Sequence, residues 1–275
     1  MGDLDRIILR HDLRGMARIA GLMPRDACVD AARLLLAQYQ RVLLLTGFHV
    51  NGVIETDGPP GALAIAQAVA DLGGHAIIVT DRFAEPILRC VVPAGLPIEE
   101  FPIAGAAESL AAARALGERL RPTLVMSIER CGTTRAGRYL NMRGSDITAY
   151  TARLDALLTL APSIAIGDGG NEIGMGSVAA LLTAELGIAE PCVTAADVLI
   201  PCAVSNWGAY GLVTALSRLT GKPLLPTATA QEALLTRLVA AGAVDGITGE
   251  AAPTVDGFDA VRQREILEEL RAAVS

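Results

Sequence analysis

The sequence is organised around the stretch SIAIGDGGNEIGMG, residues 163–176. Its first four residues form a short apolar run, and the next ten include five glycines before a helix-like segment begins at residue 177. Glycine adopts backbone conformations closed to other residues and lets the main chain approach a ligand closely. A glycine-rich turn between a strand and a helix therefore predicts a small-molecule site, although a tight connection with solvated acids has the same pattern.

Short apolar runs recur along the chain and alternate with helical patterns. Besides residues 163–166, the predicted strands cover the segments 41–46, 75–81, 98–103, 123–129 and 195–204. The predicted helices cover the segments 24–40, 60–72, 83–92, 107–120, 149–160, 177–186, 205–219, 229–241 and 259–273. The strand at 98–103 contains Pro102 and two adjacent acids, which favours the edge of the sheet.

This alternation predicts an α/β fold with a doubly wound, mostly parallel sheet and helices on both faces, a Rossmann-like three-layer sandwich. A length of 275 residues is within the range of one α/β domain. Hydrophobic residues make up 52% of the chain and aromatic residues only 3%, which is typical of buried parallel strands built from aliphatic side chains. We expect a single α/β domain over residues 1–275, with residues 1–23 as an N-terminal extension.

Composition and charge exclude several classes of partner. The net charge is −7, the isoelectric point is about 5.1 and basic residues form no run, so a nucleic-acid surface is not expected. Apolar runs are interrupted within about ten residues, which is short of the ~20 that a membrane helix needs. The N-terminus lacks an apolar signal segment and the five cysteines form no C-x-x-C pair, so we expect a cytoplasmic protein. Whether it forms a homo-oligomer is left open.

Two loops that follow predicted strands are unusually long. Residues 47–61 contain Glu55, Thr56 and Asp57 just before a helix, whose unpaired backbone N–H groups attract anions. Capping of that helix is the alternative role for these side chains. Residues 129–147 hold four arginines and three glycines in an otherwise acidic chain. Because arginine binds carboxylate and phosphate oxygens in pairs, this loop predicts an acidic substrate, unless its arginines are simply solvated.

Several familiar motifs are missing from the sequence. It has no G-x-x-x-x-G-K-[ST] and no G-x-S-x-G, which argues against P-loop phosphoryl transfer and against an α/β-hydrolase nucleophile. The glycine turn departs from the dinucleotide fingerprint, because Glu172 stands where a small residue should pack. The three histidines, His11, His49 and His75, are too scattered for a multi-histidine metal site. The remaining chemistry at the strand ends is that of carboxylates, amides and arginines.

Six segments together resemble one family. They are TGF at 46–48, ETDGPPGA at 55–62, IER at 128–130, YLNMRG at 139–144, GDGGNEIGMG at 167–176 and SNWGAYG at 205–211. In these segments the chain resembles the D-glutamate cyclase family, in the part that forms the C-terminal domain of the mitochondrial enzyme and its stand-alone bacterial relatives. The resemblance extends over about residues 25–270. It implies a lyase that converts D-glutamate to 5-oxo-D-proline with loss of water.

Such a cyclisation needs a deprotonated α-amine, an electrophilic γ-carboxyl group and an oxygen that leaves as water. We expect the acid and base groups among four carboxylates: Asp168, Glu172, Glu55 and Asp57. Substrate binding is expected from seven residues: Arg130, Arg143, Asn141, Asn171, Asn206, Gly169 and Gly170. The oxygens of Asp57, Asp168 and Glu172 would also suit a divalent cation, Mg²⁺ or Mn²⁺.

Two other functions fit the same residues. The first is a different hydro-lyase or an amidohydrolase that acts on another small amino-dicarboxylate. The second is a non-catalytic module that senses an acidic metabolite through the same arginines. The sequence determines neither the stereochemistry of the substrate nor which carboxylate is the acid and which is the base.

Overall fold

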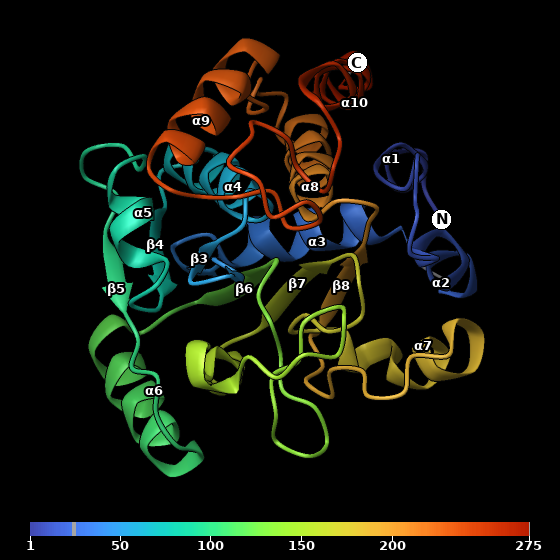
Figure 1. The fold of residues 1–275 in the computed structure, drawn as a ribbon. Coiled ribbons are helices and arrows are strands. Elements are labelled where there is room, and N and C mark those ends of the chain that lie inside the picture. Colours follow the sequence, from blue (N-terminus) through green and yellow to red (C-terminus); the bar gives the residue numbers. More distant parts are fainter. Residues whose placement is uncertain (24–25, 275) are drawn as a thin grey trace.

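The computed structural model describes residues 1–23 and 26–274. At its centre is a six-stranded sheet in the order β5-β4-β1-β6-β7-β8, and each neighbouring pair is parallel. The strands are β1 (Arg41–Leu45), β4 (His75–Thr80), β5 (Ile98–Glu100), β6 (Leu124–Ile128), β7 (Ser163–Gly167) and β8 (Val198–Pro201). The first strand of the sheet, β1, lies in its middle. The next two strands, β4 and β5, extend the sheet to one edge, and β6, β7 and β8 then extend it on the other side (Figure 1). The predicted doubly wound α/β fold is confirmed.

Helices cover both faces of the sheet (Figure 1). On one face lie α3 (Ala27–Gln38), α4 (Pro59–Asp71) and α8 (Ser205–Thr220). On the other lie α6 (Ala106–Leu120) and the 3-10 helix η2 (Leu154–Thr159). The other α-helices of the described residues are α1 (Asp3–Ile8), α2 (Met16–Leu22), α5 (Glu85–Arg89), α7 (Ala179–Leu186), α9 (Ala228–Ala240) and α10 (Ala260–Ala272). Within residues 1–23 and 26–274, no helix has both the length and the apolar character that a membrane span requires.

Alternate side chains of the central strands enter two apolar cores. In β1, Leu44 packs with the side of α3, α4 and α8, whereas Leu43 and Leu45 pack with the side of α6 and η2. Successive side chains of a strand point to opposite faces, so a continuous apolar run fills both cores at once. This is why the central strands read as unbroken apolar segments.

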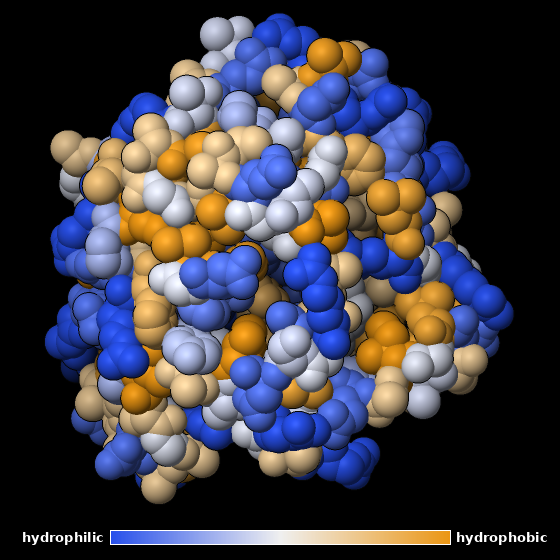
Figure 2. All heavy atoms as spheres, viewed as in Figure 1, coloured by the Kyte–Doolittle hydropathy of each residue, from blue (hydrophilic) through white to orange (hydrophobic). Residues whose placement is uncertain are grey.

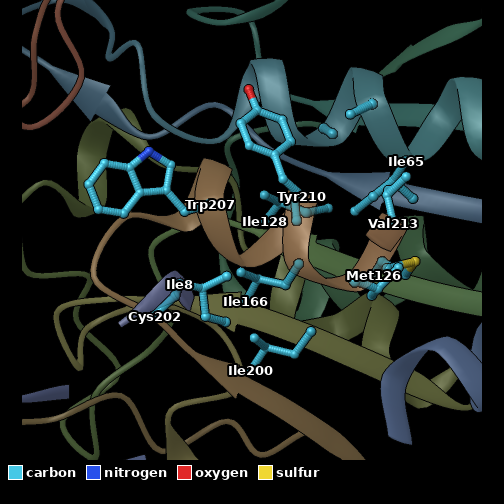
Figure 3. Packing of buried hydrophobic residues seen from close by; sticks show 14 of the residues in the cluster. Ile8, Ile65, Met126, Ile128, Ile166, Ile200, Cys202, Trp207, Tyr210 and Val213 are labelled. Atoms are coloured by element: carbon cyan, nitrogen blue, oxygen red, sulfur yellow. The ribbon is translucent and has the colours of Figure 1, made fainter. Parts of the chain in front are cut away.

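Helix α8 is buried along most of its length and packs closely on the sheet. A Cβ at Gly208 would lie 2.6 Å from Ile166 Cγ2, so this close approach requires glycine. Trp207 and Tyr210 lie in the apolar cluster that Figure 3 shows. The indole N–H of Trp207 donates to Gln263 Oε1 at 2.7 Å, which satisfies its polar edge. The start of α8 is therefore fixed at the carboxyl edge of the sheet.

The N-terminal residues pack against this same helix. Helix α1 contacts α3, α8 and α10, and its side chains Leu4 and Ile8 are fully buried. The backbone N–H of Ala203 donates to the carbonyl oxygen of Ile8 at 2.9 Å, which joins α1 to the segment after β8. The connection between α1 and α2 consequently lies close to the carboxyl ends of the strands.

The predicted helix at 149–160 is wrong, because two short 3-10 helices, η1 (Thr148–Tyr150) and η2, take its place. Thr151 between them is extended, with φ −128° and ψ 119°. The backbone of the next residue, Ala152, is held by buried side chains: its N–H donates to Asp81 Oδ2 and its carbonyl accepts from Arg130 Nη2, both at 3.3 Å. These tertiary hydrogen bonds replace the helical ones.

The predicted strand at 195–204 is too long, since β8 covers only Val198–Pro201. The residues before it pair with the glycine turn. The carbonyl oxygen of Thr194 accepts hydrogen bonds from the N–H groups of Gly174 at 2.9 Å and of Gly176 at 3.0 Å. The glycine turn therefore has its own partner segment, which the local apolar pattern does not reveal.

Other boundaries differ by smaller amounts. The long loop after β1 contains a small hairpin of β2 (His49–Val50) and β3 (Val53–Ile54). The helix predicted at 83–92 is limited to α5, and the one predicted at 177–186 is η3 (Gly176–Val178) followed by α7. The strand at 98–103 is the short edge strand β5, as predicted. The predicted start of the first helix, at residue 24, lies outside the described residues.

Candidate active site

The strand order creates a switch point between β1 and β6, from which the chain winds outward in both directions. Doubly wound sheets bind ligands beyond the carboxyl ends of the strands at such a point. Residues 46–58 follow β1, residues 129–147 follow β6, and the glycine turn follows β7. The three loop regions singled out from the sequence thus lie at one edge of the sheet.

A cavity of about 480 Å³ lies among these loops. Its lining also includes Arg14, from the connection between α1 and α2, and Gly246 and Asp256, from the segment between α9 and α10. In the view of Figure 1 these loops lie in front of the sheet, and Figure 2 shows hydrophilic side chains interspersed with hydrophobic ones in the middle of that face. The cavity is large enough for a small metabolite and is formed by parts of the chain that are far apart in sequence.

Five buried carboxyl groups line this cavity, and a sixth lies next to two of them. The five are Glu55, Glu129, Asp168, Glu172 and Asp256, and the sixth is Asp57. Oxygens of Glu129, Asp168 and Glu172 lie within 4.8 Å of one another, and so do oxygens of Asp57, Asp168 and Asp256. Asp168 belongs to both groups. All four carboxylates proposed from the sequence belong to this set of six, and the other two members are Glu129 and Asp256.

The glycine turn is folded around its own glutamate. Glu172 Oε1 accepts a hydrogen bond from the N–H of Gly169 at 2.9 Å, and Glu172 Oε2 accepts one from Gly170 at 2.8 Å. Gly170 has φ 98°, which favours glycine, and a Cβ at Gly169 would lie 2.8 Å from Glu172 Oε1. The two glycines expected to bind substrate therefore hold this carboxylate in place.

Asp57 and Asn206 tie the loop after β1 to the start of α8. Asp57 accepts hydrogen bonds from the N–H groups of Ser205 and Asn206, both at 2.7 Å. Asn206 Oδ1 accepts hydrogen bonds from the N–H groups of Gly58 at 3.1 Å and Gly61 at 2.8 Å. Neither side chain lines the cavity. Asp57 thus binds the N-terminus of α8, a helix distant in sequence. Asn206 in turn binds the backbone at the start of α4, so both side chains hold the two helices together.

Arg14 is the positive group that faces these acids. Its guanidinium lies 2.7 Å from Asp168 Oδ1 and 2.9 Å from Asp256 Oδ2. Burial alone would lower the pKa of Arg14, but the charges of Asp168 and Asp256 raise it. Arg14 therefore remains a cation and balances part of the negative charge.

Three residues of this site were missed from the sequence: Arg14, Glu129 and Asp256. Glu129 directly follows β6, so its place at a strand end was an available signal. Arg14 and Asp256 lie outside the loops that follow strands, and no local pattern marks them. Glu129 and Asp256 also have left-handed backbones, with φ 44° and 53°, which costs a non-glycine residue about 1–2 kcal/mol. The fold holds strained backbone at these two acids, as is common at functional sites.

Burial raises the pKa of all six carboxyl groups. For Asp57, burial and the charge of Asp256 raise the pKa to about 7, although backbone N–H groups oppose the shift. Burial, reinforced by neighbouring carboxylates, raises the pKa of Glu55 and Glu129 well above the ordinary value. Six acids beside one arginine cannot all be ionised in a buried site. Some of the six acids must therefore be protonated, or a further cation must bind among them.

These shifts predict how stability depends on pH. A carboxyl with a raised pKa in the folded state binds a proton there that the unfolded chain releases near pH 4. The contribution of these carboxyls to stability is therefore fully present below about pH 4 and is lost as the pH rises through the raised values, such as about 7 for Asp57. We expect the free energy of unfolding in urea to fall between pH 5 and about 8, by about 1.4 kcal/mol per pH unit for each extra proton. Glu55→Gln should make the decline shallower. A free energy that rises over this range would contradict the shifts.

Arg130 lies behind the cavity and does not line it. Its guanidinium forms a salt bridge with Asp81, and both side chains are 1% exposed. The same group donates to the carbonyl oxygens of Gly47 and Ala152. Although burial opposes the change, this partner lowers the pKa of Asp81. The substrate-binding role expected for Arg130 does not fit its position, because the guanidinium is buried outside the cavity lining and is already paired with Asp81.

Arg143 and the two other asparagines lie at the cavity. Arg143 is exposed there, and one guanidinium nitrogen donates to the carbonyl oxygen of Ile247 at 2.9 Å. Asn141 Oδ1 accepts hydrogen bonds from the N–H groups of Arg143 and Ser145, both at 3.0 Å, and so shapes this loop. Asn171 Nδ2 donates to a carbonyl oxygen of the same loop at 3.0 Å. Arg143 is thus the arginine of this loop that a ligand in the cavity can reach.

Another part of the cavity lining is less polar. Phe48, Val50, Ile147 and Tyr150 contribute to it, and His49 stacks on Tyr150 with ring centroids 4.7 Å apart. Burial lowers the pKa of His49, so this ring is neutral at neutral pH. The cavity therefore offers carboxyl groups on one side and apolar side chains on another, which suits a small amphipathic ligand.

These features define a doubly wound α/β protein with a carboxyl-lined cavity at the switch point of its sheet. The family described as "D-glutamate cyclase-like, C-terminal" matches residues 4–271, and the chain belongs to this family. The human protein "D-glutamate cyclase, mitochondrial" is 33% identical over an alignment of 225 residues, and the match covers 74% of this chain and 36% of that relative. The match spans little more than a third of the relative's length. The resemblance inferred from the sequence is confirmed.

Proposed function

We propose that this chain is a lyase that converts D-glutamate to 5-oxo-D-proline and water. The family and the name of the human relative support this reaction class. The observation that carries the proposal is the group of buried carboxyls facing one cavity, because ring closure consists of proton transfers around the formation of an amide.

The proton balance of the reaction sets what the site must do. D-Glutamate enters with an ammonium group and an ionised γ-carboxylate. The nitrogen loses two protons and forms a bond to the γ-carbon, while one γ-oxygen gains both protons and leaves as water. The protein ends in the protonation state in which it began. A carboxyl that first donates and then accepts protons meets this requirement, and its pKa should be near or above neutrality.

Glu55 fits this role best among the acids of the cavity. Its side chain is buried and its pKa is raised well above the ordinary value by burial and by Asp256. Within the described residues its carboxyl makes no hydrogen bond or salt bridge, whereas Glu172 is held by backbone N–H groups and Asp168 by Arg14. We assign to Glu55 the transfer of protons between the amine and the leaving oxygen.

The position of Glu55 depends on Gly246. A Cβ at Gly246 would lie 1.8 Å from Glu55 Oε2, so Gly246→Ala must displace this carboxyl. We expect kcat to fall about 10- to 100-fold, since small misplacements of a catalytic group have effects of this size. Gly21→Ala is the control, because a Cβ there meets no atom within 4 Å. Initial rates of 5-oxoproline formation test this, and an unchanged kcat for Gly246→Ala would remove Glu55 from the mechanism.

Arg143 is assigned to the α-carboxylate of the substrate, which takes no part in the chemistry. Arg143→Gln should raise KM about 10-fold and leave kcat nearly unchanged, because it removes one exposed charged contact made equally in the ground and transition states. Arg135→Gln, in the same loop but outside the cavity lining, is the matched control. A fall in kcat without a change in KM would place Arg143 in the chemistry instead.

One assay separates the proposed function from its alternatives. The purified protein is incubated with D-glutamate, L-glutamate and the two 5-oxoprolines, and the mixtures are followed by NMR and by calorimetry. Interconversion of D-glutamate and 5-oxo-D-proline supports the proposal. Turnover limited to another amino-dicarboxylate supports a different hydro-lyase or amidohydrolase, and saturable binding without turnover supports a metabolite sensor.

A further inference from the structure

We propose that Glu129, Asp168 and Glu172 bind one hard divalent cation, Mn²⁺ or Mg²⁺, in the cavity. All three side chains line the cavity, and they come from two different strand ends, after β6 and after β7. The inference deepens the proposed function and rests on it for the use of the cation. Binding of the cation itself is measured without substrate.

The geometry of the three carboxyls suits such an ion. One oxygen from each lies within 4.8 Å of the others. Oxygens around Mg²⁺ lie about 2.0–2.1 Å from the metal, so two opposite ligands are about 4.2 Å apart. The three side chains are therefore close enough to share one ion after small adjustments, and an octahedral ion would keep positions open towards the cavity.

An independent observation points to a missing ligand here. Asp168 is 3% exposed, and its Oδ2 is a buried atom without a hydrogen-bond partner. Its other oxygen is paired with Arg14. A buried carboxylate oxygen without a partner is costly, and only a proton or a cation can satisfy an acceptor surrounded by other acceptors. A cation satisfies Asp168 together with its two neighbours.

Hydrogen bonds from the protein orient Glu129 and Glu172, and their carboxylate oxygens retain lone pairs that can bind a metal ion. Each oxygen of Glu172 accepts one backbone hydrogen bond, from Gly169 or Gly170, and retains a second lone pair. Glu129 Oε2 accepts from Ser205 Oγ at 2.6 Å. Hydrogen bonds of this kind fix the orientation of metal ligands in proteins.

The second group of acids is less suitable. Asp57 accepts three backbone hydrogen bonds and lies outside the cavity lining. Asp256 is paired with Arg14, which already supplies a positive charge to that side. Asp57 was a candidate ligand from the sequence, but the structure places Glu129 where a cation would be reached from the cavity.

The reaction chemistry also favours a metal ion over the substrate's ammonium group at this position. Three anions around the ammonium would stabilise its charged form, whereas the attack on the γ-carbon needs a neutral amine. A divalent cation bound there would instead attract the γ-carboxylate and make its carbon more electrophilic. Glu55 lies outside the triad and remains free to move protons.

The test is a titration of chelator-treated, desalted protein with MnCl₂ in the absence of substrate, followed by the EPR signal of free Mn²⁺. The wild-type protein should remove one Mn²⁺ per chain from solution. Asp168→Asn and Glu172→Gln should each weaken binding at least about 10-fold. Glu55→Gln is the matched control: it removes an acid of the same cavity outside the triad and should bind Mn²⁺ like the wild type.

Circular dichroism checks that each variant is folded, and a rise in the melting temperature of the wild type with Mn²⁺ gives a second readout that needs no variant. The inference is overturned if millimolar Mn²⁺ neither binds to nor stabilises the wild type. Binding that survives both triad substitutions, or that Glu55→Gln weakens equally, overturns it as well. Mn²⁺ binding without cyclisation would defeat the proposed function alone. Cyclisation by a protein that fails to bind Mn²⁺ would defeat the inference alone.

Discussion

Asp168→Asn is expected to lower kcat/KM for D-glutamate about 10³-fold while the protein remains folded. The substitution keeps the shape of the side chain but removes its charge. Asp168 is the member shared by the two groups of acids, and it holds the guanidinium of Arg14 at 2.7 Å. Loss of this charge alters the charge balance of the whole cavity, so the effect should exceed that of Arg143→Gln.

The matched control is Asp71→Asn, the same change at an exposed position of α4. It should leave kcat/KM within about two-fold of the wild type, as is usual for surface substitutions far from a site. Initial rates of 5-oxoproline formation on proteins of equal circular dichroism make the comparison. If Asp168→Asn retains the full rate, the cavity described here is not the catalytic site.

Arg130→Met is expected to lower the free energy of unfolding by about 3–5 kcal/mol, because it leaves Asp81 as a buried charge without its partner. Both members of this salt bridge are 1% exposed, and the same arginine also donates to the carbonyl oxygens of Gly47 and Ala152. It thereby joins three segments: the loop after β1, the end of β4 and the segment between η1 and η2. Urea unfolding at pH 7 measures the effect.

The double variant Arg130→Met with Asp81→Leu separates a structural role from a substrate-binding one. Removing both charges should restore a large part of the lost stability, since the cost lies mainly in the unpaired carboxylate. A substrate-binding arginine would behave differently: its loss would raise KM at nearly constant stability. That result would return Arg130 to the role expected from the sequence.

The fold could be predicted because its determinants are local. Strands buried on both faces read as continuous apolar runs, such as residues 41–46, and the alternation with helices then implies a parallel, doubly wound sheet. The failures have tertiary causes. The helix expected at 149–160 is interrupted because Asp81 and Arg130 hold the backbone of Ala152, and neither side chain is near it in sequence.

The candidate site was predictable only in part, for the same reason. Residues at strand ends, such as Glu55 and Asp168, could be found because parallel strands share one edge. Arg14 and Asp256 reach the cavity from an N-terminal connection and from a segment near the C-terminus, and only the packing of α1 and α10 on α8 brings them there. Arg130 shows the opposite problem, since its type suggests a ligand contact and only burial shows that its partner is Asp81.

The most direct measurement follows ¹⁸O from the γ-carboxylate of D-glutamate by mass spectrometry. If the protein closes the ring at that carboxyl with loss of water, the labelled substrate should become 5-oxo-D-proline that keeps one of its two γ-oxygens as ¹⁸O, and the other should appear in water. D-Glutamate labelled only in the α-carboxylate should keep all of its label in the product. Absence of 5-oxo-D-proline, or label lost from the α-carboxylate, would contradict the proposed reaction.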